Sequence, residues 1–464
     1  MEAGQLWRQY VIAGIANIAM ASIAYSMGWT SPIYIKLQDE NLTDSPLPAP
    51  LTIDESAWVG SFLPIGAIMG SFIGGLAASK IGRKWSLLCA AMSQFVGWIL
   101  VAAATKVGFL YGGRVFWGIT LGMLFTVLPM YCAEIATDDV RGALGSLLQA
   151  FMNVGYLLVY GIGPFTSYSV VAYVGMAFVA VFAICFFFMP ETPVYHLSKN
   201  ERELAAECLK RIRGRSRAGV ESEVNQMADH ISSSMEKTAT LADVFRGSNF
   251  KAFYITCALL FFQQFSGINA VIFYMSSIFR AAGSDLDWSI STIIVGVIQL
   301  VASMLTPLVV DRLGRRIPLL VSTFGTATSL GLLGMYYLVS DQKSPVVSSI
   351  GFLPILSMVL FIVTYSWGLG PLPWALLGEL FPIEVKAVAT PIISGFCGIL
   401  TFLVTRYFEP IANALGMYVV FWLLGVCCAA GFFFTLFLVP ETKGKSLQEI
   451  QDMLAGRKSR AGKA

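Results

Sequence analysis

Residues 79–84 read Ser-Lys-Ile-Gly-Arg-Lys, and residues 311–316 read Asp-Arg-Leu-Gly-Arg-Arg. Each hexapeptide directly follows an apolar run that is long enough to cross a bilayer. Two other landmarks recur between the same parts of the chain: the Pro-Glu-Thr tripeptides at 190–192 and 440–442, and the glutamates Glu134 and Glu379 that end apolar runs. The three landmarks keep the same order at a spacing of roughly 230–250 residues, so the chain reads as two similar halves in a parallel repeat.

The apolar runs predict an all-α membrane protein with twelve transmembrane helices in two pseudo-symmetric six-helix halves. Only 13% of the 464 residues are charged and 56% are hydrophobic, whereas about a quarter of a soluble domain is charged. Such long runs predict helices, because a backbone in lipid must satisfy its own hydrogen bonds. The expected spans are 9–29, 56–79, 85–105, 108–131, 144–165, 169–189, 252–277, 288–310, 317–339, 350–377, 386–409 and 414–439.

The basic residues predict the orientation and the domain boundaries. Lys and Arg gather in the loops after the second and eighth spans and between the sixth and seventh, which predicts that these loops and both termini are cytosolic. The predicted domains are residues 1–189, a cytosolic linker at 190–250, residues 251–440 and a cytosolic tail at 441–464. Asn41 begins a glycosylation sequon, Asn41-Leu42-Thr43, in the first outer loop.

Several function classes find no support in the composition. A net charge of +3 does not indicate a nucleic-acid partner, and two histidines with eight scattered cysteines give no metal-ligand spacing. No nucleophile–base set or phosphate-binding loop appears. We therefore expect neither an enzyme nor a bound cofactor or metal. The first apolar run lacks the pattern of a cleavable signal. The short tail argues against a nutrient sensor with a long signalling tail.

Seven motifs together resemble the sugar porters of the major facilitator superfamily over nearly the whole chain. They are Gly113–Gly118, Pro129–Glu134, Arg141–Gly145, Pro190–Pro193, Gln263–Asn269, Gly314–Arg316 and Pro440–Gly444. A narrower likeness, to insect facilitated trehalose transporters, lies in Arg8–Tyr10, Tyr25–Pro32 and Trp58–Pro64. The resemblance implies a transporter in the plasma membrane that moves a neutral sugar by alternating access. We expect it to function as a monomer in the lipid bilayer.

A sugar site in a membrane is expected to combine amide and aromatic side chains. Amides donate and accept hydrogen bonds without an ionic desolvation cost, and aromatic rings cover the apolar faces of a sugar. The candidate substrate-binding residues are Gln149, Gln263, Gln264, Asn269, Gln299 and Trp374. The resemblance implies that these positions face or border the substrate. The competing interpretation is that membrane amides only bind neighbouring helices.

Helix breaks are expected beside two of these candidates. On an unbroken helix Gln264 and Asn269 would point about 140° apart. Gly267 lies between them, and a break there would turn both amides toward one cavity. A second break is expected at Gly368–Pro373, just before Trp374, because prolines interrupt helices.

The charged landmarks predict a gate. The candidate gating residues are Arg83, Arg114, Glu134, Arg141, Arg315, Arg316 and Glu379. Exposed charge pairs contribute only about 0–1 kcal/mol each, but several together bias a nearly balanced equilibrium. Arg114 lies near the outer end of its span and is expected to act on the outer side. The alternative is that the basic residues only anchor the topology.

Two departures from the family pattern bear on the substrate and on coupling. Cys397-Gly398 stands where many relatives have Asn-Trp, which is expected to reshape the site and leaves trehalose or a hexose as the cargo. Ser26 stands where proton-coupled relatives have Asp, and no Asp or Glu lies at a span centre. We therefore expect a uniporter, with a proton-coupled sugar symporter as the alternative.

Overall fold

Twelve spans are present in the computed structural model, as the sequence predicts. The structure describes residues 5–41, 44–235, 240–283 and 286–455. In that part of the chain, twelve helical segments are long and apolar enough to cross a membrane. They are Leu6–Leu37, Ile53–Lys80, Arg83–Ala102, Val107–Ile135, Asp139–Phe165, Tyr168–Phe187, Gly247–Ala282, Trp288–Leu313, Arg316–Asp341, Leu353–Leu380, Val388–Leu415 and Met417–Leu438.

Three of the spans consist of two helices each. Span one is α1 (Leu6–Gly28) and α2 (Thr30–Leu37), span seven is α12 (Gly247–Gln264) and α13 (Ile268–Ala282), and span ten is α16 (Leu353–Trp367) and α17 (Leu372–Leu380). The other spans are α3 (Ile53–Lys80), α4 (Arg83–Ala102), α5 (Val107–Ile135), α6 (Asp138–Ile162) with the short η1 (Gly163–Phe165), α7 (Tyr168–Phe187), α14 (Trp288–Leu313), α15 (Arg316–Asp341), α18 (Ile383–Leu415) and α19 (Met417–Leu438).

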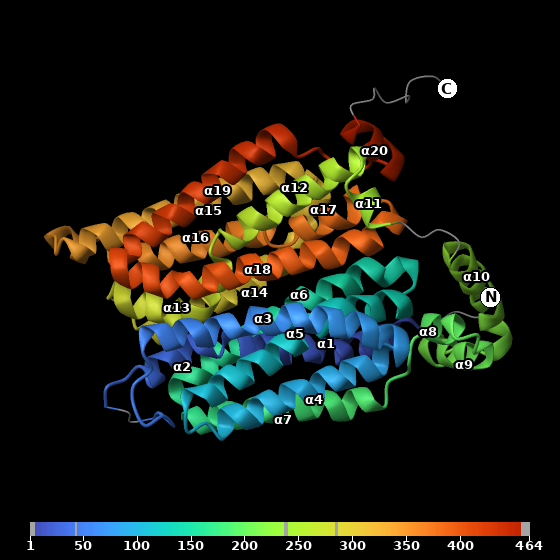
Figure 1. The fold of residues 1–464 in the computed structure, drawn as a ribbon, viewed down its shortest axis with the longest axis horizontal. Coiled ribbons are helices and arrows are strands. Elements are labelled where there is room, and N and C mark those ends of the chain that lie inside the picture. Colours follow the sequence, from blue (N-terminus) through green and yellow to red (C-terminus); the bar gives the residue numbers. More distant parts are fainter. Residues whose placement is uncertain (1–4, 42–43, 236–239, 284–285, 456–464) are drawn as a thin grey trace. The chain divides into compact units, whose positions relative to one another are not determined.

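Shorter helices lie between and after the spans. They are α8 (Pro193–Ser198), α9 (Arg202–Arg213), α10 (Arg217–Met235), α11 (Leu241–Val244), η2 (Pro345–Ser349) and α20 (Leu447–Leu454). The first three form a group of their own after α7 (Figure 1). They lie in the predicted linker, which is therefore largely helical between its two ends.

The chain divides into two compact units. The first comprises Met1–Trp29, Glu40–Pro50 and Phe62–Thr238, and the second comprises Thr30–Asp39, Leu51–Ser61 and Ala239–Ala464. The predicted domain boundaries remain a prediction. The short segments of the second unit that precede residue 62 are α2 and the first turns of α3.

Small residues allow the helices of the first unit to approach closely. A Cβ on Gly70 of α3 would lie 2.1 Å from the carbonyl oxygen of Ile119 in α5, and one on Gly118 would lie 2.1 Å from that of Leu63. Backbones this close are typical of helix packing in membranes, where attraction comes from van der Waals contact rather than from the exclusion of water.

The second unit has an apolar core that includes its broken helices, and α2 also packs within this unit. The helices α15 and α19 run side by side (Figure 1), and α12, α17 and α18 share a buried apolar cluster that includes Leu259, Leu376 and Ile393. The helix α2 packs on α13, where Ser31 Oγ lies 2.8 Å from Ser276 Oγ. Span one therefore contributes its last helix to the unit that holds spans seven to twelve.

Candidate functional site

The two expected helix breaks are both present in the second unit. The helix α12 ends at Gln264, and α13 begins after Gly267, whose φ of +81° is in the left-handed region that glycine adopts without strain. The helix α16 ends at Trp367, and α17 begins at Leu372, after Pro371. Each break frees backbone groups that need partners inside the protein.

Gln263 joins the two breaks. Its Nε2 donates to the carbonyl oxygens of Leu369 at 2.7 Å and Gly370 at 2.8 Å, both in the gap between α16 and α17. The hydroxyl of Ser322 in α15 accepts from the Leu369 backbone N–H at 2.9 Å. The Gln263 side chain is only 3% exposed, so its amide nitrogen is committed to holding the backbone of span ten.

Gln264 and Asn269 meet across the first break. The Oε1 of Gln264 accepts from Asn269 Nδ2 at 2.6 Å and from Thr401 Oγ1 of α18 at 3.1 Å. Its Nε2 donates to Cys397 Sγ at 3.2 Å and to Gln263 Oε1 at 3.3 Å. Asn269 and Thr401 are half-buried. The break at Gly267 therefore brings together two amides that a continuous helix would separate, as expected.

Thr401 joins this network although the sequence interpretation did not include it. The signal was available, because Thr401 lies one helical turn after Cys397, at the place where the family pattern departs. Cys397 contributes a sulfur acceptor, and Thr401 Oγ1 also donates to the Cys397 carbonyl at 2.8 Å.

The remaining substrate-binding candidates lie on other helices. Gln299 is buried in α14, and Trp374 is 39% exposed on α17. Gln149 is exposed on α6 in the first unit, and its Nε2 donates to Asn153 Oδ1 at 3.4 Å. The part played by each of these six residues in binding stays a prediction.

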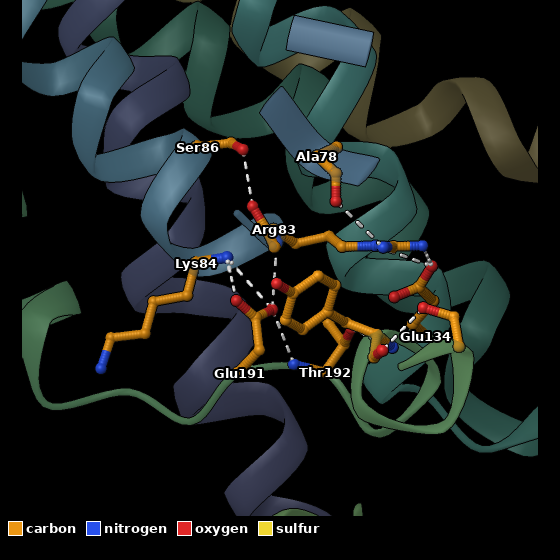
Figure 2. Close-up of polar contacts among 10 residues, drawn as sticks. Ala78, Arg83, Lys84, Ser86, Glu134, Glu191 and Thr192 are labelled. Atoms are coloured by element: carbon orange, nitrogen blue, oxygen red, sulfur yellow. Dashed lines mark hydrogen bonds and ion pairs between the residues drawn. The ribbon is translucent and has the colours of Figure 1, made fainter. Parts of the chain in front are cut away.

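Two of the gating candidates form an ion pair in the first unit. Arg83, at the start of α4, donates to Glu134 Oε1 at the end of α5, from Nε at 3.1 Å and from Nη2 at 2.7 Å. Glu191 accepts from the backbone N–H groups of Arg83 and Lys84 at 3.1 Å and 3.0 Å (Figure 2). A carboxylate here balances the partial positive charge at the beginning of α4.

The second unit repeats this arrangement. Arg315 donates to Glu379 Oε1 from Nε at 3.0 Å and from Nη2 at 2.8 Å. Glu441 accepts from the backbone N–H groups of Arg315 and Arg316 at 3.0 Å each, at the beginning of α15. Thr442 Oγ1 also donates to Glu379, at 2.5 Å. The repeated landmarks thus place equivalent residues in equivalent contacts.

The two matched glutamates differ in their pKa. Burial raises the pKa of Glu191 above its ordinary value, although several backbone N–H groups oppose the effect. Burial also acts on Glu441, but the N–H groups of Arg315, Lys443 and Arg316 outweigh it, so the pKa of Glu441 is lowered. The difference follows from the deeper burial of Glu191.

Arg114 and Arg141 lie apart from these ion pairs. Arg114 is fully buried in α5, and its Nη1 donates to the Ser26 carbonyl oxygen at 3.1 Å. The Ser26 hydroxyl accepts from Gln94 Nε2 at 2.9 Å. Arg141 is exposed near the start of α6. The position where proton-coupled relatives carry Asp therefore lies beside an arginine but holds a hydroxyl.

A second polar cluster in the second unit surrounds Glu409 of α18. The Glu409 carboxylate accepts from Ser56 Oγ at 2.5 Å and from Gln38 Nε2 at 3.0 Å. One turn earlier, Arg406 pairs with Asp54 at 2.5 Å. The sequence interpretation gave these residues no role, because contacts across 350 or more positions leave no local pattern.

Asn41 of the sequon is exposed, whereas Leu42 and Thr43 lie outside the described residues. Within the described residues, no group of three or more His, Cys, Asp or Glu side chains is placed to hold a metal ion.

Comparisons with known proteins agree with this architecture. The chain is 34% identical to the facilitated trehalose transporter Tret1 of Apis mellifera ligustica, over 97% of this chain and 88% of that protein. It is 36% identical to the Tret1 of Polypedilum vanderplanki, over 96% and 88%, and 35% identical to that of Anopheles gambiae, over 97% and 56%. The chain thus spans about half the length of several curated relatives that it matches.

A solved structure shows the same fold. The inward-open conformation of the xylose transporter XylE from E. coli matches with a TM-score of 0.79 and 24% identity, over 96% of this chain and 99% of that one. A likeness at this level of identity concerns the fold, which is the major facilitator fold of twelve helices in two six-helix halves.

A family profile described as "Sugar (and other) transporter" matches residues 4–454. The matched residues include the Arg83–Glu134 and Arg315–Glu379 ion pairs and the helix breaks of spans seven and ten. The chain belongs to this family of membrane transporters.

Proposed function

We propose that the chain carries a neutral sugar, trehalose or a hexose, across the plasma membrane by facilitated transport. The observation that carries the proposal is the amide and hydroxyl network of Gln264, Asn269 and Thr401 beside a helix break. Partly exposed groups that both donate and accept match the hydroxyls of a sugar. The relatives at 34–36% identity are facilitated trehalose transporters.

Within this proposal, Gln263 positions the site and Asn269 contacts the sugar. The Nε2 of Gln263 donates to the carbonyls of Leu369 and Gly370. Asn269 is half-buried, and its Nδ2 donates one hydrogen bond, to Gln264. Gln149, Gln299 and Trp374 complete the proposed set. Five or six hydrogen bonds of about 1 kcal/mol, less ordering costs, give a dissociation constant near millimolar, which suits a carrier that must release its cargo.

We further propose passive uniport. A symporter needs a titratable group that faces both sides in turn, and an ionisable residue in mid-membrane is costly unless it has such a role. Ser26 provides only a hydroxyl and a carbonyl beside Arg114. The sugar gradient alone then drives transport.

The repeated ion pairs are the proposed inner gate. Arg83–Glu134 and Arg315–Glu379 stiffen equivalent helix junctions, one in each unit. In each pair two arginine N–H groups donate to one carboxylate oxygen, and the side chains are partly buried. Such charge-assisted hydrogen bonds are stronger than those between neutral groups. In this proposal Arg316 contributes positive charge beside Arg315, Arg141 contributes it at the start of α6, and Arg114 supports the outer side.

The orientation follows from the basic loops. We place both termini and the α8–α10 segment in the cytosol, together with the basic residues Arg83, Lys84, Arg315 and Arg316. A monomer in the bilayer suffices for this mechanism, and glycosylation at Asn41 would fall on the outer face.

Uptake of labelled trehalose and labelled glucose into proteoliposomes, each competed by the other unlabelled sugar, tests the proposal. Saturable uptake of one sugar that stops at equal inside and outside concentrations is expected. A protonophore and a change of external pH should leave the final level unchanged. Uphill accumulation that collapses with the protonophore would assign the chain to the symporters instead, and no saturable uptake of any sugar would refute the proposed cargo class.

A further inference from the structure

A cavity of about 920 Å³ lies in the first unit between the start of α4 and the segment α8–α9. Five cationic side chains line it: Arg8, Lys84, Lys210, Arg211 and Arg215. Two carboxylates, Glu191 and Glu207, also line it. The cavity therefore carries an excess of positive charge, and none of these cations takes part in the Arg83–Glu134 ion pair.

The two carboxylates offset only two of the five positive charges. Glu191 accepts from the backbone N–H groups of Arg83, Lys84 and Thr192. Glu207 lies 3.7 Å from Lys210. Arg8 donates to Gln5 and to the Arg211 carbonyl rather than to a carboxylate. The three other cations, Lys84, Arg211 and Arg215, form no ion pair among the described residues.

The side chains of these three cations keep donors for a ligand. The Lys84 side chain extends away from the Arg83–Glu134 pair (Figure 2), and its Nζ lies over the rings of Trp85 and Phe187 at 5.6 Å and 5.4 Å. The Nη2 of Arg211 donates one hydrogen bond to the Phe188 carbonyl at 2.6 Å, and its other N–H groups are available to a ligand. In the part of the chain that the structure describes, the Nε of Arg215 is buried and has no hydrogen-bond partner. A buried donor in this condition is destabilising unless a ligand satisfies it.

The rim of the cavity is apolar on the side of the span. Trp85 and Ile81 line this side and are exposed, and Leu204 of α9 adds an exposed apolar side chain from the opposite side. Arginines that gather around a cavity bind phosphate oxygens through two parallel N–H groups, and basic pockets at the cytosolic ends of spans bind phosphorylated headgroups. An uncharged sugar would leave these cations uncompensated.

We propose that this cavity binds a phosphate monoester, with Lys84, Arg211 and Arg215 as its ligands. The ligand joins the first turn of α4 to α9, so it would tie the α8–α9 segment to the span that carries Arg83. This proposal is separate from the proposed sugar-binding network of Gln264, Asn269 and Thr401, which lies in the other unit. The phosphate group comes either from the headgroup of a membrane lipid or from a soluble phosphate ester.

Binding to the full chain in nanodiscs distinguishes the two sources. One arm compares nanodiscs of phosphatidylcholine alone with nanodiscs that also contain phosphatidylinositol 4-phosphate, by native mass spectrometry. The other arm titrates inositol trisphosphate and inorganic phosphate onto chain in phosphatidylcholine alone. Retention of the phosphoinositide without a response to the soluble probes assigns the lipid source, and a response to inositol trisphosphate assigns a soluble ester.

Charge-removing variants test the residues. Arg211→Gln and Arg215→Gln are each expected to weaken binding about tenfold, and their thermal unfolding reports whether they fold. The matched control is Arg217→Gln, which removes the same charge from the same segment at an exposed residue paired with Glu203. Absence of binding in the wild type, unchanged binding in both cavity variants, or an equal loss in Arg217→Gln would overturn the proposal.

Discussion

The amide of Gln263 supports the backbone of span ten, whereas that of Asn269 is partly open. Gln263 bonds two carbonyls that the break between α16 and α17 leaves free, and it is almost fully buried. Asn269 bonds Gln264 and is half-buried. Neighbouring amides of one motif therefore have different physical tasks.

Substitutions of Gln263 and Asn269 are expected to have different effects on stability and on sugar uptake. Gln263→Leu leaves two buried carbonyls unsatisfied and is expected to lower the free energy of unfolding by about 1–3 kcal/mol per group. Asn269→Ala removes a partly exposed amide, so it should weaken sugar uptake with a smaller loss of stability. Thermal unfolding in detergent and uptake at equal protein density measure both. A Gln263→Leu protein as stable as the wild type would contradict the structural task.

Glu441 and Glu191 are expected to respond to pH in opposite directions. The pKa of Glu441 is lowered, so its stabilising contribution is complete above its ordinary value of 4.5 and is lost as pH falls through the folded-state pKa. The pKa of Glu191 is raised, so its ionisation opposes folding above that raised pKa, and stability recovers as pH falls through it.

The variants Glu441→Gln and Glu191→Gln test this difference through their melting temperatures. At pH 7, Glu441→Gln should lower the melting temperature more than Glu191→Gln does. The difference in melting temperature between Glu441→Gln and the wild type should stay constant down to pH 4.5 and narrow only below it. Equal melting temperatures for the two variants across this range would refute the asymmetry.

At the level of the helices, the break between α12 and α13 depends on the left-handed residue Gly267. An alanine at Gly267 would adopt a φ of +81° at a cost of about 1–2 kcal/mol, and its Cβ would lie 2.6 Å from Leu424 Cδ1. Gly267→Ala is therefore expected to lower both stability and uptake, because it disturbs the break that aligns Gln264 with Asn269.

Gly283→Ala is the matched control. Gly283 also has a positive φ, of +59°, but it ends α13 and a Cβ there meets nothing within 4 Å. This variant should lose similar conformational energy and keep its uptake per folded molecule. An equal fall in uptake per folded molecule for both variants would show that the position of the break is unimportant.

The sequence predicts the breaks but not what joins them. Gly267 and the Gly368–Pro373 stretch mark both interruptions locally. The bond from Gln263 to Leu369 spans 106 positions, and only the packing of α12 against α17 creates it. Likewise, α2 extends span one to Leu37, beyond the expected end at 29, because Pro32 is tolerated in a first helical turn.

For the molecule as a whole, we predict that α2 and α13 separate in the proposed alternating-access cycle. Ser31 and Ser276 join these helices with their Oγ atoms 2.8 Å apart. The double variant Ser31→Cys/Ser276→Cys should form a disulfide under mild oxidation, since that distance is compatible with a short Cβ–Cβ separation. Uptake should stop on oxidation and return on reduction.

Two comparisons control for other thiols. The wild type has eight cysteines of its own, so it and Ser31→Cys alone must keep their uptake under the same oxidant. A cross-linked double variant that still transports at the wild-type rate would show that α2 and α13 stay together through the cycle.

The bond between Gln263 and span ten also has a consequence for biosynthesis. While the ribosome is still making spans eight and nine, the amide of Gln263 has no carbonyl from span ten to bind, and hydrocarbon offers it none. We expect nascent chains that stop before residue 369 to hold span seven at the insertion machinery or to expose it to quality control, and chains that extend past span ten to release it.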